Sequence, residues 1–211
     1  MDLSTLESTR RSLHGLAELV LAGPQFARSG DIRLRVTPGG FATVAEPDLA
    51  VEAYALVAPS GRLRLTGSIA SLAALAGVEP RDLRDVYAEG PTIGVDDALT
   101  VDEEAAREIL GAFARGDGAL RLLAPDEEPV LWPEHFDVGI SLDEVNYGVS
   151  PGDAHCAEPY AYVGPWKRRT GPFWNVAFGA ARPMRELGNL DDVRQFFAAG
   201  ADYAAEDPEA D

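Results

Sequence analysis

The stretch PVLWPEHFDVGISLDEVNYGVSPGD, residues 129–153, decides the fold class. It contains short apolar or alternating runs, which Pro and Gly residues separate at intervals too short for a crossover helix. Antiparallel strands joined by tight turns have this pattern. The segments EPYAYVGPW and GPFWNVAFGAA continue it. We therefore predict three or four antiparallel β-strands in residues 129–180, with no helix longer than two turns between residues 132 and 165.

A second group of strands is predicted nearer the N-terminus. DIRLRVT (residues 31–37) alternates apolar side chains with arginines, and PGG at residues 38–40 turns the chain into FATVAE. DLAVEAYALVA and GRLRLTG continue the alternation on either side of the turn PSG at residues 59–61. Because alternate side chains point to opposite faces of a strand, we expect a small antiparallel sheet with one face buried and one face in water.

Four stretches carry apolar side chains at helical spacing. We expect the first to end at Gly23–Pro24, and we expect Thr100 and Glu103 to form a capping box at the start of the third. After residue 115 the third either continues past a flaw or gives way to a second short helix, and Gly116 and Gly118 favour a break, because glycine is a weak helix former. The predicted helices are residues 4–22, 68–77, 101–115 and 189–200.

These elements predict an α+β fold, in which an antiparallel β-sheet, or two such sheets, packs against about four helices. We expect residues 1–211 to form a single domain, since no low-complexity linker and no sequence repeat divides the chain. The alternative is a division near residues 100–128. Residues 1–100 would then form a helix with a small sheet, and residues 129–200 an aromatic-rich β module with a C-terminal helix.

The composition is that of an ordinary globular protein, with 46% apolar and 25% charged residues. The net charge of -17 opposes binding to nucleic acid, because each phosphate contact needs a local cation. The longest apolar runs are shorter than the ~20 residues of a membrane helix, and no basic and apolar leader is recognisable. We therefore expect a cytoplasmic protein that binds neither nucleic acid nor membranes. Its oligomeric state is left open.

Aromatic side chains are concentrated in residues 129–182, which hold nine of the seventeen in the chain and all three tryptophans. A small β core filled by large rings has this composition. So does an apolar pocket with a few polar groups, the usual lining of a small-molecule site. On the second interpretation, the substrate-binding residues are Trp132, Asn146, Tyr160, Tyr162 and Trp166.

Two pairs of histidine and aspartate are the candidate catalytic groups: His135 with Asp137, and Asp153 with His155. In a strand, His135 and Asp137 would share one face, since side chains alternate with a period of two. If the two pairs converge, His135, His155 and Asp153 form a set of ligands suited to a divalent metal. The cofactor, if any, is otherwise left open. The alternative interpretation is structural: Asp137 caps a turn and His135 hydrogen-bonds a backbone carbonyl.

The segments LWPEHFD, SPGD, EPYAYVGPW and FWN together resemble a bacterial family of uncharacterised proteins that carry W-P-x-H-F-D, S-P-G-D and E-P-Y motifs. The resemblance covers about residues 129–180 and implies no activity. It implies that His135, Asp137, Asp153 and Tyr160 are neighbours. The segments IRLRV, GRLRLTG and SIASLAALAG look like a sterol-carrier-type domain, which would imply an apolar ligand between sheet and helix.

Two functional hypotheses follow. The first is a small-molecule-binding protein with its site between residues 132–137 and 150–160, and its enzymatic form would be a metal-assisted hydrolase or isomerase. The second is a non-enzymatic domain that binds an apolar ligand or another protein. Nucleotide-binding folds and the common hydrolase fold lack support, because the chain has no G-x-G-x-x-G, P-loop or G-x-S-x-G motif.

Overall fold

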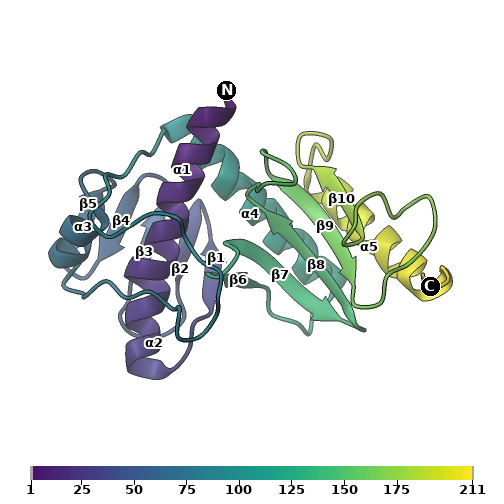
Figure 1. The fold of residues 1–211 in the computed structure, drawn as a ribbon, viewed down its shortest axis with the longest axis horizontal. Coiled ribbons are helices and arrows are strands. Elements are labelled where there is room, and N and C mark those ends of the chain that lie inside the picture. The colour runs from purple at the N-terminus through teal and green to yellow at the C-terminus, as the bar shows by residue number, and fades with distance from the viewer. Residues whose placement is uncertain (1, 211) are drawn as a thin grey trace.

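A computed structural model describes residues 2–210 and has the predicted α+β fold. Within these residues, ten strands form one sheet in the order β10-β9-β8-β7-β6-β1-β2-β3-β4-β5 (Figure 1). Every strand pair is antiparallel, and neighbours in the sheet are also neighbours in the chain except β1 and β6. The described strands are β1 (Leu34–Thr37), β2 (Gly40–Thr43), β3 (Ala50–Glu52), β4 (Ala55–Ala58), β5 (Gly61–Arg64), β6 (Val130–Trp132), β7 (Asp137–Leu142), β8 (Val145–Ser150), β9 (Tyr160–Pro165) and β10 (Ala180–Pro183).

Four helical rods pack against this sheet in the described part of the chain. The first is continuous and has three parts, because a π-helical stretch, η1, lies between two α-helices. Among residues 2–210, no helix combines the length and the apolar composition needed to cross a membrane. The helices are α1 (Leu3–Gly15), η1 (Leu16–Ala22), α2 (Gly23–Ser29), α3 (Ile69–Ala76), α4 (Glu103–Leu123) and α5 (Leu190–Glu206).

The order of elements is the same in the two halves of the chain: a long helix, five antiparallel strands in sequence, and a second helix. The five-stranded halves of the sheet meet at β1 and β6, where Leu34 pairs with Leu131. The sheet order therefore reads identically outward from this pair in both directions. The hydrophobic core is continuous across the β1–β6 pair, since buried residues of both halves belong to one cluster.

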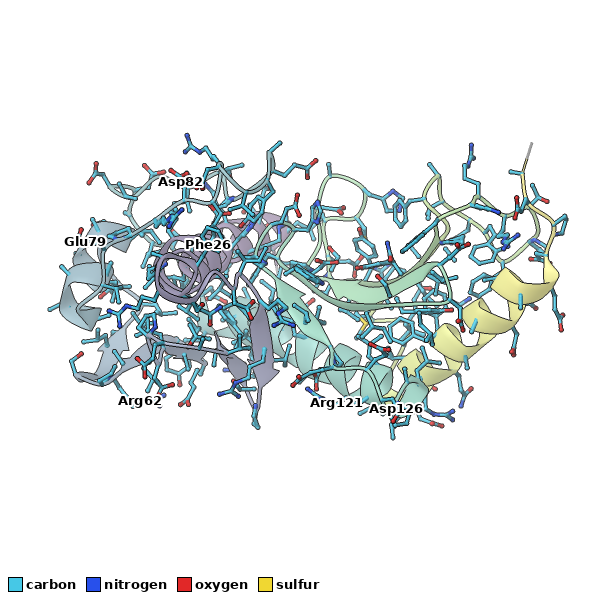
Figure 2. All side chains as sticks on the ribbon, turned by 90° about the horizontal axis from the view of Figure 1, so that it is seen from below. Phe26, Arg62, Glu79, Asp82, Arg121 and Asp126 are labelled. Atoms are coloured by element: carbon cyan, nitrogen blue, oxygen red, sulfur yellow. The ribbon has the colours of Figure 1, made fainter. Side chains whose placement is uncertain are left out.

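The helices of the two halves cover the same apolar face of the sheet, because the paired residues Leu34, Leu131 and Val138 share that face and are all buried. The sheet is twisted, so this face points to opposite sides of the molecule in the two halves. Figure 1 shows the N-terminal rod in front of β1–β3, with α4 and α5 behind β7–β10. Figure 2, viewed from below, shows the same separation: Phe26, near the end of the rod, lies above the strands, and Arg121, near the end of α4, lies below them. One face of β7–β9 packs on α4 and α5, and the other face is left without a long helix over it.

The N-terminal rod does not end at Gly23–Pro24, as the sequence pattern predicts. All seven residues of η1 are buried, and the chain remains helical until Gly30, which adopts φ 74° as the C-cap. Proline normally stops a helix because its ring meets the carbonyl group four residues earlier and it lacks an N–H. The π turn that precedes Pro24 already breaks the regular hydrogen-bond ladder, so Pro24 is accommodated at the first turn of α2.

The predicted break in the third helix is also wrong. α4 runs through Gly116 and Gly118, and its N-cap is Asp102, whose carboxylate accepts hydrogen bonds from the amides of Glu104 and Ala105. Gly116 lies against β8, where a methyl group in its place would be 2.6 Å from a Cγ of Val149. The glycine therefore allows helix and sheet to approach closely, and packing outweighs its weak helix propensity.

The strands of residues 129–180 are antiparallel as predicted, and no helix lies between residues 132 and 165. The C-terminal half contributes five strands to the sheet, β6–β10, rather than three or four. The fifth, β10, pairs with β9 after a long loop that carries Phe173 and Trp174, which pack against the core.

Substitution of alanine at two glycines of α4 separates propensity from packing. Gly116→Ala is expected to lower the free energy of unfolding by about 1–3 kcal/mol, because the added methyl group overlaps Val149. Gly111→Ala, in the same helix with no atom within 4 Å of the added methyl group, is expected to raise it by about 0.5–1 kcal/mol. Urea unfolding of both variants measures the difference; stabilisation by Gly116→Ala would contradict the close packing.

Candidate functional site

A cavity of about 700 Å³ lies between α1 and the face of β7–β9 that α4 does not cover. Its volume is within the range of small-molecule sites, about 300–1,000 Å³. The turn between β6 and β7, the loop after β8 and the segment 89–92 complete its wall. Five of the predicted site residues meet at this cavity: His135, Asp137, Asp153, Tyr160 and Tyr162.

The register of three strands places Tyr162 over this cavity. Gly139 pairs with Gly148, and Gly148 pairs with Tyr162, so all three residues belong to one face. The tyrosine ring lies across Gly148, where a methyl group would be 2.5 Å from the hydroxyl oxygen. Because Gly148 has no side chain, the ring can lie flat and bring its hydroxyl group to Asp137 at the start of β7.

Asp137 and Tyr162 form a buried polar pair. The Tyr162 hydroxyl donates a hydrogen bond to Oδ2 of Asp137, and only 9% of the Asp137 surface is exposed. Burial raises the pKa of Asp137, although the hydrogen bond from Tyr162 opposes this change. Burial and the adjacent carboxylate both raise the pKa of Tyr162. Asp137 is therefore held by a tyrosine, and the turn-cap interpretation of this residue is wrong.

A second tyrosine–aspartate pair lies beside the first. The Tyr160 hydroxyl donates to Oδ2 of Asp153 at 2.6 Å, and the rings of Tyr160 and Tyr162 are 6.4 Å apart. The other oxygen of Asp153 accepts hydrogen bonds from the amides of His155 at 2.7 Å and Cys156 at 3.1 Å. Asp153 thus fixes the loop conformation as well as the ring of Tyr160. Burial and the carboxylate both raise the pKa of Tyr160.

The opposite wall comes from α1, which the sequence interpretation did not include in the site. Arg10 and Arg11 point into the cavity, and Arg10 donates a hydrogen bond to the carbonyl of Ala157 at 3.1 Å. Arg11 forms an ion pair with Asp97 at 2.7 Å. Burial lowers the pKa of Arg10. Both arginines lie more than a hundred residues from the strands they face, so no local motif connects them.

His14 is the histidine with a clear structural role. Its Nε2 lies 2.8 Å from the carbonyl oxygen of Pro133, so Nε2 carries the proton and donates it. The imidazole stacks on the ring of Phe136 at 5.4 Å. Burial lowers the pKa of His14 to about 4, and the side chain is therefore neutral at pH 7. One interpretation of the sequence predicts that His135 hydrogen-bonds a backbone carbonyl. In the structure His14 makes such a contact.

His135 and Asp137 do not share a strand face. Residues 133–136 form a turn, His135 is exposed, and its Nε2 lies 3.2 Å from a carboxylate oxygen of Glu89. Phe136 adopts φ 54° and turns its ring into the core, which reverses the direction of the neighbouring side chains. His155 is also exposed and contacts the ring edges of Tyr160 and Phe178.

The predicted metal ligands are not brought together. Within residues 2–210, no three His, Cys, Asp or Glu side chains are grouped so that they could hold a metal ion. Of the predicted substrate-binding residues, Trp132, Asn146 and Trp166 lie outside the cavity wall. Asn146 instead accepts hydrogen bonds from the indole N–H of Trp166 at 3.1 Å and the hydroxyl of Ser141 at 2.8 Å, further along the same sheet face.

A second, smaller pocket of about 180 Å³ occupies the equivalent place in the other half of the fold. Its wall is formed by α4, the β1–β2 turn and the β3–β4 turn. α1 contributes residues 7, 10, 11 and 14 to the wall of the large cavity. α4 contributes to the smaller pocket the residues whose numbers are higher by 100. Those residues are Arg107, Leu110, Gly111 and Ala114, and α4 also contributes Glu103, which has no counterpart among the described residues that line the large cavity.

The β1–β2 turn matches the β6–β7 turn in the same way. Gly39 and Phe136 each adopt positive φ directly before the next strand begins, at 75° and 54° respectively. The first residue of that strand is Gly40 in one half and Asp137 in the other. The same architecture therefore forms with a glycine in place of the buried carboxyl group.

Comparison of the chain with protein-family models, with curated proteins and with solved structures found no match. The family resemblance of residues 129–180 stays a prediction. The functional argument therefore depends on the geometry of the cavity.

The stability of the protein is expected to fall as the pH decreases from about 6.5 to about 4. Because the pKa of His14 is lowered in the fold, the unfolded chain takes up this proton first, and the contribution of neutral His14 is lost across that range. The expected loss is about 1–3 kcal/mol. His14→Gln keeps an N–H for Pro133 and should show a shallower pH dependence in urea unfolding. Equal slopes for the two proteins would contradict the buried neutral imidazole.

Proposed function

We propose that this chain binds a small organic molecule in the cavity between α1 and β7–β9, with Asp137 and Tyr162 as its polar anchor. The observation that carries the proposal is the contrast between the two equivalent pockets. The wall of the large cavity includes a buried carboxyl group, Asp137, whereas the smaller pocket has none among residues 2–210. Apart from Tyr54, Glu103 and Arg107, the smaller pocket is lined by glycine, alanine and leucine. The fold tolerates the second kind of lining, so folding alone gives no reason for the first.

The cost of the polar lining supports the proposal. Burying a carboxyl group is unfavourable unless hydrogen bonds or charges compensate it. Within residues 2–210, Asp137 has one hydrogen-bond partner in another residue, the hydroxyl of Tyr162. At the equivalent position, the first residue of β2, Gly40 carries no side chain, and a methyl group there would be 1.8 Å from the carbonyl oxygen of Val51. Residues that reduce stability in a cavity are typical of binding and catalytic sites.

A second candidate function is proton transfer to or from the bound molecule. The observation that favours it is the raised pKa of Asp137 at the edge of a solvent-accessible cavity. A carboxyl group with a raised pKa is suited to general acid–base catalysis near neutral pH, as in hydrolases and isomerases. Asp137 would be the acid or base, and Tyr162 would hold it in position.

The experiment is a screen of a small-molecule library by protein-observed NMR. Ligands are expected to shift the resonances of residues 134–137, 150–153 and 160–162. Thr92 is an exposed residue of the cavity wall, and Thr92→Trp should weaken binding at least about tenfold by filling the mouth. Thr66→Trp, at an exposed position outside both pockets, is the matched control and should leave binding unchanged.

A library without any ligand for these residues, or ligands indifferent to Thr92→Trp, would contradict the proposed function and favour a scaffold or protein-interaction role. For each confirmed ligand, turnover is then followed by NMR. Turnover that Asp137→Asn abolishes while binding persists would identify the second candidate function.

A further inference from the structure

The hydrogen-bonding groups near Asp137 are mainly acceptors. The hydroxyl protons of Tyr160 and Tyr162 are both donated to carboxylates, so the lone pairs of these hydroxyl oxygens are what a ligand would meet. The second carboxylate oxygen of Asp137 has no hydrogen-bond partner in another described residue. A molecule that binds at this end of the cavity must therefore supply hydrogen-bond donors.

Other carboxyl groups lie near Asp137. Glu134 raises the pKa of Asp137, whereas His135 lowers it and in turn lies 3.2 Å from a carboxylate oxygen of Glu89. Glu134 takes part in no ion pair within residues 2–210. Three carboxyl groups thus gather at this end, and no arginine or lysine pairs with Asp137 or Glu134.

The arginines of the cavity are engaged elsewhere. Arg11 is paired with Asp97 and also donates to the carbonyl of Thr92 at 3.1 Å. Arg10 donates to the carbonyl of Ala157, and its charged neighbours are Glu7 and Asp153. Their positive charge is offset at the α1 end of the cavity and does not compensate Asp137.

We propose that the bound molecule is a small organic cation whose primary ammonium group donates hydrogen bonds to Asp137 and Tyr162. This inference rests on the proposed function and specifies its ligand class. Hydrogen bonds between an ammonium group and a carboxylate are among the stronger ones in proteins. The rings of Tyr160 and Phe178, which also line the cavity, provide an apolar wall for the body of the ligand.

The state of Asp137 agrees with this ligand class. Burial raises the pKa of Asp137 because few groups in the fold stabilise its ionised form. An ammonium group at hydrogen-bond distance supplies that stabilisation. An anionic ligand would instead face Asp137, Glu134 and Glu89, and a neutral polyol would satisfy the acceptors but leave the charges uncompensated.

The test uses three probes that share a phenyl ring and a short chain: 2-phenylethylamine, 2-phenylethanol and 3-phenylpropionate. Each is titrated into the full chain at about pH 7 and followed by NMR. We expect the amine to bind at least about tenfold more tightly than the alcohol or the carboxylate, since a charge-assisted hydrogen bond contributes about that factor. Asp137→Asn should lower the affinity for the amine to that for the alcohol.

Two further variants keep the test informative. Glu103→Gln, in the smaller pocket, removes the same charge from the chain and should leave amine binding unchanged. Glu134→Gln, at a partly exposed position, should weaken amine binding severalfold and serves if Asp137→Asn fails to fold.

Each outcome separates the two proposals. Equal or tighter binding of the alcohol or the carboxylate at the cavity would overturn the ammonium inference and leave the proposed function intact. The same conclusion follows if Asp137→Asn and Glu134→Gln both bind the amine normally, or if the library finds cavity ligands and the amine does not bind. If neither the library nor the probes yields a ligand for the cavity, both proposals fail.

Discussion

The ring of Phe136 joins four parts of the chain on which the cavity depends. It is fully buried, stacks on His14 of α1, and meets the rings of Phe41 in β2 and Phe113 in α4 edge to face, with centroids 5.5 and 5.1 Å away. To place its ring there, Phe136 adopts φ 54°, which costs a residue other than glycine roughly 1–2 kcal/mol. The packing energy of a large buried ring exceeds this cost. The consequence is local: the next residue, Asp137, begins β7 at the floor of the cavity.

The strands could be predicted from the sequence because their information is local. Alternating apolar residues and turns rich in Pro and Gly predict the two runs of antiparallel strands, and the structure contains both, as β1–β5 and β6–β10. Their union into one sheet was not predictable in this way, since it depends on the pairing of Leu34 with Leu131, far apart in the chain. The repeated topology was also hidden, because equivalent positions such as Gly39 and Phe136 differ in chemistry. The length of α4 was also not predictable, because the helix continues through Gly116, where close packing against Val149 outweighs the weak helix propensity of glycine.

The candidate site was predictable in part for the same reason. His135, Asp137, Asp153 and Tyr160 come from consecutive turns and strands, and all four line the cavity. The contribution of α1 was missed because nothing in its own pattern marks the side of the helix that faces a distant loop. One local signal was available: glycines inside two predicted strands, such as Gly148, indicate close approach of another group, and here that group is Tyr162. The outward turn of His135 depends on the positive φ of Phe136, which no residue-type rule predicts.

The symmetric sheet order makes the chain comparable to a two-fold dimer whose subunits have been fused. In a true homodimer, each substitution appears in both subunits, so both pockets must accept the same side chains. Fusion removes that restriction. A carboxyl group that destabilises the fold is then introduced once rather than twice, while the other pocket keeps glycine and alanine and its packing. The N-terminal half can therefore be optimised for stability while the C-terminal half carries the polar groups that reduce it, which a single chain permits and identical subunits do not.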